Sequence, residues 1–278
     1  MLLQHGNNEE AKTPYQISET VTIEKAEYAK DLGILVDEDL KWSQQIATAT
    51  ASAAQLVGWI MRVFQSRTKE VVLMLHKSLV RPKVEYGCVV WHPHLISDIA
   101  KLESVQRTIT ARIEGMEQYN YWERLQHLGL YSLQRRRERY LCIHMFKIYS
   151  GILPNNLELN FYESYRHGPK CRRKTLIAQN SKINTIRCNS FSDVGATLFN
   201  VLPKQIKAAK TVESFKFRLD KMLRSLPDCP PIQGYVRRNN NSIRDWLLTE
   251  STSSWRMTEH DDDLDEVVEQ QSLTQPAS

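Results

Sequence analysis

The sequence lacks the features that define several large protein classes. No apolar run approaches the roughly 20 residues that a transmembrane helix needs, and no signal peptide is expected, because the first three residues run directly into polar ones. Its five cysteines are odd in number and irregularly spaced, which argues against a disulfide framework. No Gly-rich phosphate loop or nucleophile elbow is present. We therefore expect an intracellular protein, nuclear or cytoplasmic, with reduced thiols, no membrane association and no cofactor.

Negative charge is scarce in the middle of the chain. Residues 58–150 carry a net charge of +7 and residues 151–250 carry +9, whereas residues 1–57 carry −5 and residues 251–278 carry −6. A basic body between acidic ends is typical of a surface that binds a polyanion. Solvated helix faces that happen to be rich in arginine are the alternative, and charge alone leaves it open.

Apolar residues recur at helical spacing through residues 43–154, so the sequence predicts a mainly α-helical fold. A long helix is expected from Gln44 to about Phe64, with Ser43 as its cap. Its apolar face is formed by Ile46, Ala49, Ala53, Leu56 or Val57, and Ile60. Trp59 lies beside this face, and we expect it in the core rather than as a platform for stacked bases.

Two further amphipathic helices are predicted between residues 68 and 112, joined at residues 91–93. Pro82 would cost an uninterrupted helix about 3 kcal/mol, so we expect a kink there, with helix resuming from 84 to 90. Cationic side chains fall between the apolar positions of both helices, among them Lys77, Arg81 and Arg107. Cys88, His92 and His94 are close in sequence but lack a matching second pair of ligands, so no metal site is predicted.

A strong helix is predicted from Ser132, its cap, to about Ser150. Its first turns carry four arginines: Arg135, Arg136, Arg137 and Arg139. Cations at this helix end oppose the helix dipole, which favours an external anion such as phosphate. A nuclear-localisation run and a crowded solvated face are the two alternatives.

The remaining chain divides by composition. Residues 155–185 lose the apolar period and gain basic residues (Lys170, Arg172, Arg173 and Lys174), so we expect a basic linker. Residues 186–250 contain a second helical block, in which Thr211 caps a helix with Phe215 and Leu219 on its apolar face. The N-terminal residues 1–42 are predicted to form a short β segment. Residues 251–278 are rich in Ser and Thr and then acidic, and we expect them to be disordered.

Several motifs, in order along the chain, resemble the region that follows the polymerase active site in non-LTR retrotransposon reverse transcriptases of the jockey-like group. They are KDLGILVDEDL (30–40), KSLVRPKVEYGCVVWHPH (77–94), KLESVQRTITARI (101–113) and SFKFRLD (214–220). The resemblance implies a primer-grip hairpin at the edge of the palm in residues 1–42, a helical thumb in 43–154 and a C-terminal extension in 186–250. Two positions depart from the family pattern: Phe199 stands where tryptophan is usual, and Val194 where arginine is expected.

The resemblance also implies a function. The family places its two catalytic carboxylates in an aromatic-x-Asp-Asp hairpin, but the adjacent aspartates of this sequence are Asp261–Asp263 in the acidic tail, so we expect no catalytic residues and no polymerase activity. The expected partner is an RNA–DNA hybrid or DNA duplex, bound through its backbone, with no small-molecule substrate. The expected contact residues are Lys30, Asp31, Leu32, Gly33, Lys77, Arg81, Arg107, Arg135, Arg136 and Arg139. The alternative is a structural remnant or a protein-interaction module derived from a retrotransposon.

Overall fold

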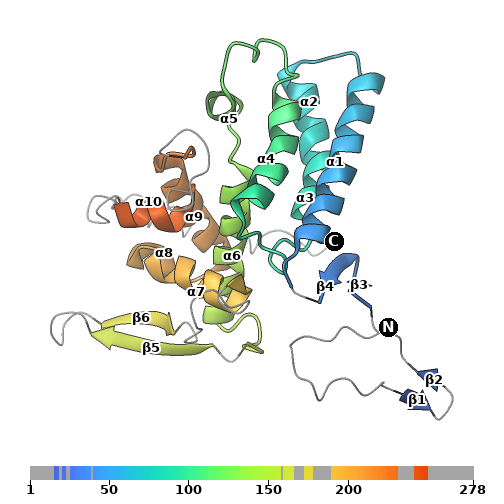
Figure 1. The fold of residues 1–278 in the computed structure, drawn as a ribbon. Coiled ribbons are helices and arrows are strands. Elements are labelled where there is room, and N and C mark those ends of the chain that lie inside the picture. The colour runs from blue at the N-terminus through green and yellow to red at the C-terminus, as the bar shows by residue number, and fades with distance from the viewer. Residues whose placement is uncertain are drawn as a thin grey trace, which may run out of the picture. The chain divides into compact units, whose positions relative to one another are not determined.

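The protein is described by a computed structural model, which covers residues 16–18, 21–22, 26–38, 40–157, 159–165, 172–177, 189–230 and 241–249. The chain forms two compact units, Met1–Leu128 with Asn184–Ile186, and Gly129–Ile183 with Arg187–Ser278. The fold is mainly helical with a short N-terminal antiparallel hairpin, which confirms the predicted fold class (Figure 1). The boundary between the units differs from the predicted division, because it separates residues 129–154 from the helices that precede them.

The first unit is built from two hairpins and a group of helices. Its strands are β1 (Gln16–Ser18), β2 (Val21–Thr22), β3 (Tyr28–Asp31) and β4 (Ile34–Asp37). Its helices are α1 (Ser43–Val63), α2 (Lys69–Leu75), the π-helix η2 (His76–Val80), α3 (Arg81–Glu85), α4 (Ile96–Thr110) and α5 (Tyr121–Leu128). In Figure 1 the run α2–η2–α3 and helix α4 lie beside α1, and the β3–β4 hairpin lies at the end of α1 where this helix begins.

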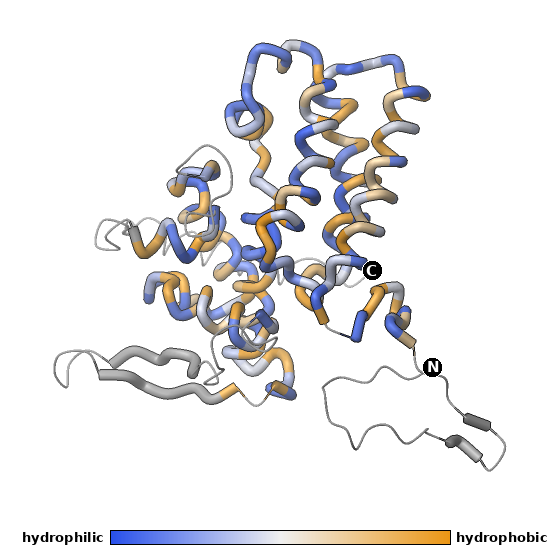
Figure 2. Tube along the Cα trace, viewed as in Figure 1, coloured by the Kyte–Doolittle hydropathy of each residue, from blue (hydrophilic) through white to orange (hydrophobic). Residues whose placement is uncertain are grey.

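Helix α1 buries the predicted apolar face against α3 and α4, since Ile46, Ala53 and Ile60 have no solvent exposure. Figure 2 shows hydrophobic and hydrophilic residues alternating along α1 and α4, as expected for helices with one buried face. The prediction for Trp59 is wrong: its side chain is 46% exposed, because it lies outside the narrow apolar stripe. Small alanines in that stripe let neighbouring helices approach closely.

The start of α1 also differs from prediction. Its N-cap is Trp42, in the left-handed region with φ 64°, and Ser43 is the first helical residue. The Ser43 hydroxyl instead donates to the buried carboxylate of Asp98 at 3.0 Å, in the first turn of α4. Lys101 pairs with the same carboxylate at 3.0 Å. Ser43 therefore links the first turns of α1 and α4 rather than capping its own helix.

Pro82 is accommodated by a π turn. The amide of Arg81 donates to the carbonyl of His76, five residues earlier, so that η2 joins α2 to α3 without a break in the helical run. This wider turn moves the preceding carbonyls away from the proline ring. The predicted continuation of helix to residue 90 is wrong, because α3 ends at Glu85 and Gly87 has a positive φ of 62°.

The second unit surrounds one central helix. Its elements are α6 (Leu133–Tyr149), β5 (Asn160–Tyr165), β6 (Arg172–Ile177), α7 (Phe191–Val201), α8 (Lys204–Lys207), α9 (Val212–Ser225) and α10 (Ile243–Thr249). Helix α6 packs on α7 and α9, where the rings of Phe146 and Phe215 stack with centroids 4.2 Å apart. The two predicted caps are confirmed: Ser132 accepts from the amide of Arg135, and Thr211 from the amide of Ser214, each at 3.1 Å.

The described part of the predicted basic linker is not a loop. Strands β5 and β6 pair antiparallel over six residues, from Asn160 opposite Ile177 to Tyr165 opposite Arg172. The cluster Arg172–Lys174 therefore lies on a strand, whereas Lys170 is outside the described residues. Aromatic residues in β5 and the Thr-Leu-Ile run in β6 favour strands, and this signal outweighs the high density of charge.

Among the described helices, none is long and apolar enough to cross a bilayer. The predicted tail, residues 251–278, lies outside the described residues, as does most of residues 1–25.

Candidate nucleic-acid interface

The β3–β4 hairpin turns at Leu32 and Gly33, the centre of the predicted contact site. Asp31 pairs with Ile34, which leaves a two-residue loop, and both loop residues have positive φ, 45° and 84°. This is the geometry of a type I′ turn, which matches the twist of the strands. Gly33 is therefore a turn residue rather than the bulge that a glycine within a strand suggests. Leu32 is 82% exposed and forms the tip of the hairpin.

The hairpin is held against the helices by polar contacts at its turn and in β4. The amide of Leu35 donates to the side-chain carbonyl of Gln45 on α1 at 2.9 Å. The hydroxyl of Tyr86, just after α3, donates to the carbonyl of Leu32 at 2.8 Å. These bonds fix the position of the turn relative to α1 and α3.

A close backbone approach at Gly87 completes this attachment. A Cβ atom at Gly87 would lie 2.6 Å from Cδ1 of Ile34, a buried residue of β4, and the residue also has φ 62°. The indole of Trp91 donates to the carbonyl of Tyr86 at 2.7 Å and is itself fully buried. The Glu-Tyr-Gly sequence that carries part of the family resemblance thus positions the hairpin.

Backbone strain is concentrated around this hairpin. The non-glycine residues with positive φ in the described chain are Leu32, Leu40 and Trp42. A left-handed conformation costs a residue such as leucine about 1–2 kcal/mol. Such strain gathers at functional sites, where surrounding contacts hold it in place. The run from residue 32 to 42 is therefore a candidate for a site whose backbone shape matters.

A cleft of about 500 Å3 lies between the hairpin, α1 and α3. Lys30 and Lys83 line it from opposite elements, β3 and α3, and none of its described lining residues is acidic. The rest of the lining combines Gln45, Thr48, Ser52 and Tyr86 with apolar residues of β4, α1 and α3 and with Gly33. Two ammonium groups, two hydroxyls and an aromatic ring are suited to an anionic ligand that carries a sugar.

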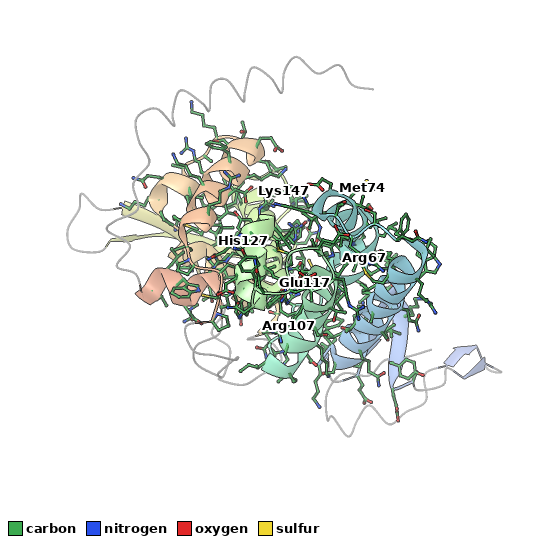
Figure 3. All side chains as sticks on the ribbon, turned by 90° about the horizontal axis from the view of Figure 1, so that it is seen from above. Arg67, Met74, Arg107, Glu117, His127 and Lys147 are labelled. Carbon is green, nitrogen blue, oxygen red and sulfur yellow. The ribbon has the colours of Figure 1, made fainter. Side chains whose placement is uncertain are left out.

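The structure brings some of the predicted residues together and separates others. Lys30 and Gly33 line the cleft, and Asp31 and Leu32 are exposed beside it. Lys77 is exposed on η2, and Arg81 pairs with Glu85 at 3.5 Å. Arg107, labelled in Figure 3, lies on α4 with its guanidinium 4.9 Å from the centroid of the Tyr121 ring. The prediction omitted Lys83 and Tyr86, although both stand in the motif that carries the resemblance.

The arginines of α6 lie in the second unit, and internal acceptors surround two of them. Arg135 is fully buried and donates to the carbonyls of Leu223, Leu226 and Pro227, at and after the end of α9, at 2.5–3.3 Å. Arg139 makes a bidentate pair with Asp220, at 2.5 and 2.7 Å. Carbonyl oxygens and a carboxylate of the same chain thus bind these two arginines, in the place where an external anion was predicted. Arg136 donates to Tyr140 on its own helix at 2.8 Å.

Arg137 differs from its neighbours. Its guanidinium is 1% exposed, and none of its three nitrogens has a hydrogen-bond partner in the described structure. Glu138, the next residue, is fully buried and accepts from the amide of Ile243 at 2.6 Å, at the start of α10. Burial raises the pKa of the Glu138 carboxyl to about 7, against the opposing effect of its hydrogen bonds to Ile243 and Ser242.

Within the described residues, no three His, Cys, Asp or Glu side chains gather as metal ligands would. The cleft itself presents cationic and hydroxyl groups, with an exposed turn beside them.

Comparison with known proteins gives one informative similarity. Over 102 residues, 36% of this chain, the sequence is 26% identical to a probable RNA-directed DNA polymerase from transposon X-element of Drosophila melanogaster. The matched part spans 11% of that protein's length. No protein-family profile matches the chain, and no solved structure matches it. The chain thus contains a region similar to a transposon reverse transcriptase.

Proposed function

We propose that this chain is derived from the post-palm part of a retrotransposon RNA-directed DNA polymerase of the jockey-like group and binds the backbone of an RNA–DNA hybrid or DNA duplex. The contact is made at the cleft between β3–β4, α1 and α3. The observation that carries the proposal is that Lys30 and Lys83 line the same cleft, which has no acidic residue among its described lining. The similarity to a transposon polymerase supports it independently.

The cleft suits the sugar-phosphate backbone rather than the base edges. Lysine ammonium groups bind phosphate as point charges, and the hydroxyls of Thr48 and Ser52 add donors along α1. The hairpin turn presents a backbone with no side chain at Gly33, which allows close approach of a strand. Contacts of this kind position a duplex without reading its sequence.

The surface that we propose is smaller than the predicted one. Lys77 lies on the same helical run as Lys83 and is exposed, so it extends the cationic surface. Arg135 is left out, because its guanidinium is buried and bound by carbonyls at the end of α9. Arg139 is also left out, because its carboxylate partner Asp220 already neutralises it.

The test compares two double variants of equal charge. Lys30→Gln with Lys83→Gln removes both cleft cations, and Arg62→Gln with Arg112→Gln removes two exposed cations elsewhere in the first unit. Binding of a fluorescent 20-base-pair RNA–DNA hybrid is measured by anisotropy at several salt concentrations. For 4–6 phosphate contacts, log K falls with log salt with a slope of about −4 to −5, and each lost contact makes it shallower by about 1.

We expect the cleft variant to weaken binding about tenfold or more and to make the slope shallower by about 2, with the control variant near wild type. Circular dichroism should show both variants folded. Equal losses in the two variants would mean that general charge, not the cleft, binds the duplex. No binding at low salt would contradict the proposed function.

That last outcome would favour a protein-interaction module, for which the structure offers one observation. Trp59 and Val63, one helical turn apart on α1, are 46% and 53% exposed, and Met74 on α2, labelled in Figure 3, is 60% exposed. Large apolar side chains exposed in groups mark surfaces that bind other proteins.

A further inference from the structure

A strongly basic surface lies in the second unit, apart from the cleft. Residues 204–224 contain seven Lys and Arg against two Asp and Glu. Both carboxylates are already paired: Glu213 lies 2.8 Å from Lys216, and Asp220 lies 2.5 Å from Arg139. Residues 204–224 therefore carry a net charge of +5.

The helical positions of α9 separate these charges. Phe215, Leu219 and Met222 form its buried face. The paired residues Glu213, Lys216 and Asp220 fall on one flank of that face, whereas Arg218 and Lys221 fall on the opposite flank.

Helix α8 lies along this second flank. The guanidinium of Arg218 donates to the carbonyl of Gln205 at 2.7 Å, which fixes α8 beside it. Lys204 and Lys210 are exposed at the start of α8 and just beyond its end. We call the set formed by these two lysines and the second flank of α9 the α8–α9 basic face: Lys204, Lys210, Arg218 and Lys221. No acidic residue of α8 or α9 lies within it.

The chain itself carries a complementary segment. Residues 251–278 have a net charge of −6, and their seven acidic residues all lie between Glu259 and Glu269. The segment follows α10, which packs on α7 in the same unit as α8 and α9. Glu259 lies ten positions after Thr249, and an extended chain spans about 3.3–3.6 Å per residue. The reach of about 35 Å exceeds the roughly 30 Å diameter of a small domain.

We propose that the α8–α9 basic face is the docking surface for the acidic segment 259–269 of this same chain. Tethering converts the contact into an intramolecular one with an effective concentration in the millimolar range, so weak ion pairs suffice. The docked segment covers the basic face with carboxylates and excludes other polyanions from it. Contacts between solvent-exposed charges are screened by salt, so docking depends on ionic strength.

The test uses the full chain, dilute and without nucleic acid, treated with a carbodiimide that joins a lysine amine directly to a carboxylate. We expect mass spectrometry to find links from Lys204, Lys210 or Lys221 to the segment 259–269 within one molecule. Raising the salt from 0.15 M to 1 M shortens the Debye length from about 8 Å to about 3 Å, so the yield should fall about tenfold.

Two full-length variants sharpen the test. Lys204→Gln with Lys210→Gln should lower the total yield of links to the acidic segment severalfold, whereas Lys69→Gln with Lys101→Gln should leave it unchanged. Links distributed equally over lysines of both units, links between two molecules, or no links at all would each overturn the proposal. So would a DNA duplex that protects the α8–α9 lysines in a chain whose acidic segment forms no links, since that face would then bind nucleic acid.

Discussion

Arg135 and Arg137 lie two residues apart on α6, and both are almost completely buried. Within the described structure the guanidinium of Arg135 has hydrogen-bond acceptors, whereas that of Arg137 has none. Arg135 binds carbonyls at the end of α9 and lies 3.5 Å from the carboxylate of Asp228. A buried guanidinium with partners holds elements together, whereas one without partners retains its full cost of desolvation. The two neighbours should therefore respond oppositely to the same substitution.

Arg137→Met is expected to leave the free energy of unfolding unchanged or to raise it by about 1–3 kcal/mol, because methionine fills similar volume without a charge. Arg135→Met should lower it by about 3–5 kcal/mol, because Asp228 and the carbonyls at the end of α9 would lose their partner. Urea unfolding followed by circular dichroism measures both. A large loss of stability in Arg137→Met would mean that this guanidinium has a partner beyond the described residues.

Glu138 should make stability depend on pH. Its pKa in the folded chain is about 7, above the ordinary value of 4.5, so the folded state binds its proton more tightly. This contribution is fully present below pH 4.5 and is lost as the pH rises through 7, by up to about 3 kcal/mol. Glu138→Gln keeps an acceptor for the amide of Ile243 and cannot titrate.

The measurement is the difference in unfolding free energy between wild type and Glu138→Gln from pH 4.5 to pH 8. The variant should gain stability relative to wild type as the pH rises. The exposed Glu117→Gln is the matched control and should show a flat difference. A flat difference for Glu138→Gln as well would contradict the raised pKa.

Gly87→Ala tests the attachment of the hairpin. Gly115 is the matched control, since both glycines have positive φ, 62° and 77°, but a Cβ at Gly115 meets nothing within 4 Å. Alanine at either site adds backbone strain of about 1–2 kcal/mol, and at Gly87 it also meets Cδ1 of Ile34 at 2.6 Å. Unfolding should therefore show a larger loss at Gly87, and duplex binding should weaken in that variant alone.

A second substitution separates the clash from the backbone strain. Ile34→Val removes the Cδ1 atom, so it should restore part of the stability lost in Gly87→Ala and none of that lost in Gly115→Ala. Equal losses at the two glycines, with no rescue, would mean that the hairpin is not held by this close approach.

The purified chain is expected to incorporate no nucleotides on a primed RNA template with magnesium or manganese. The reason is that its adjacent aspartates lie at positions 261–263, without the aromatic-x-Asp-Asp signature that holds two metal ions. Radiolabelled nucleotide incorporation is the measurement. Template-dependent synthesis that survives repurification would show that this chain has a polymerase centre.

Local signals in the sequence predicted much of the helical fold. The stripe that includes Ile46 and Ile60 repeats at helical spacing, and Ser132 and Thr211 cap their helices through bonds only three residues long. The hairpin turn was harder to place, because leucine at a position of positive φ does not carry the usual Asn-Gly signal.

The partners of the α6 arginines could not be predicted, because Asp220 and Asp228 lie 81 and 93 residues away from Arg139 and Arg135. Charge in sequence does not reveal which cations are neutralised by the fold. For the same reason the sequence predicted only some of the residues that line the cleft. Lys30 and Lys83 are 53 residues apart and are brought together by the packing of the hairpin on α1 and α3.

The π turn at His76–Val80 has a consequence for how this sequence can change in length. It adds one residue to the helical run before Pro82, and a residue advances the helix by about 100°. Deleting one residue here would rotate Lys83 and Tyr86 out of the cleft and bring the proline ring against the carbonyl ladder. Substitutions within the segment leave the rotation of α3 about the helix axis unchanged. In descendants that keep the cleft, the number of residues between Leu75 and Pro82 should therefore be inherited more strictly than their identities.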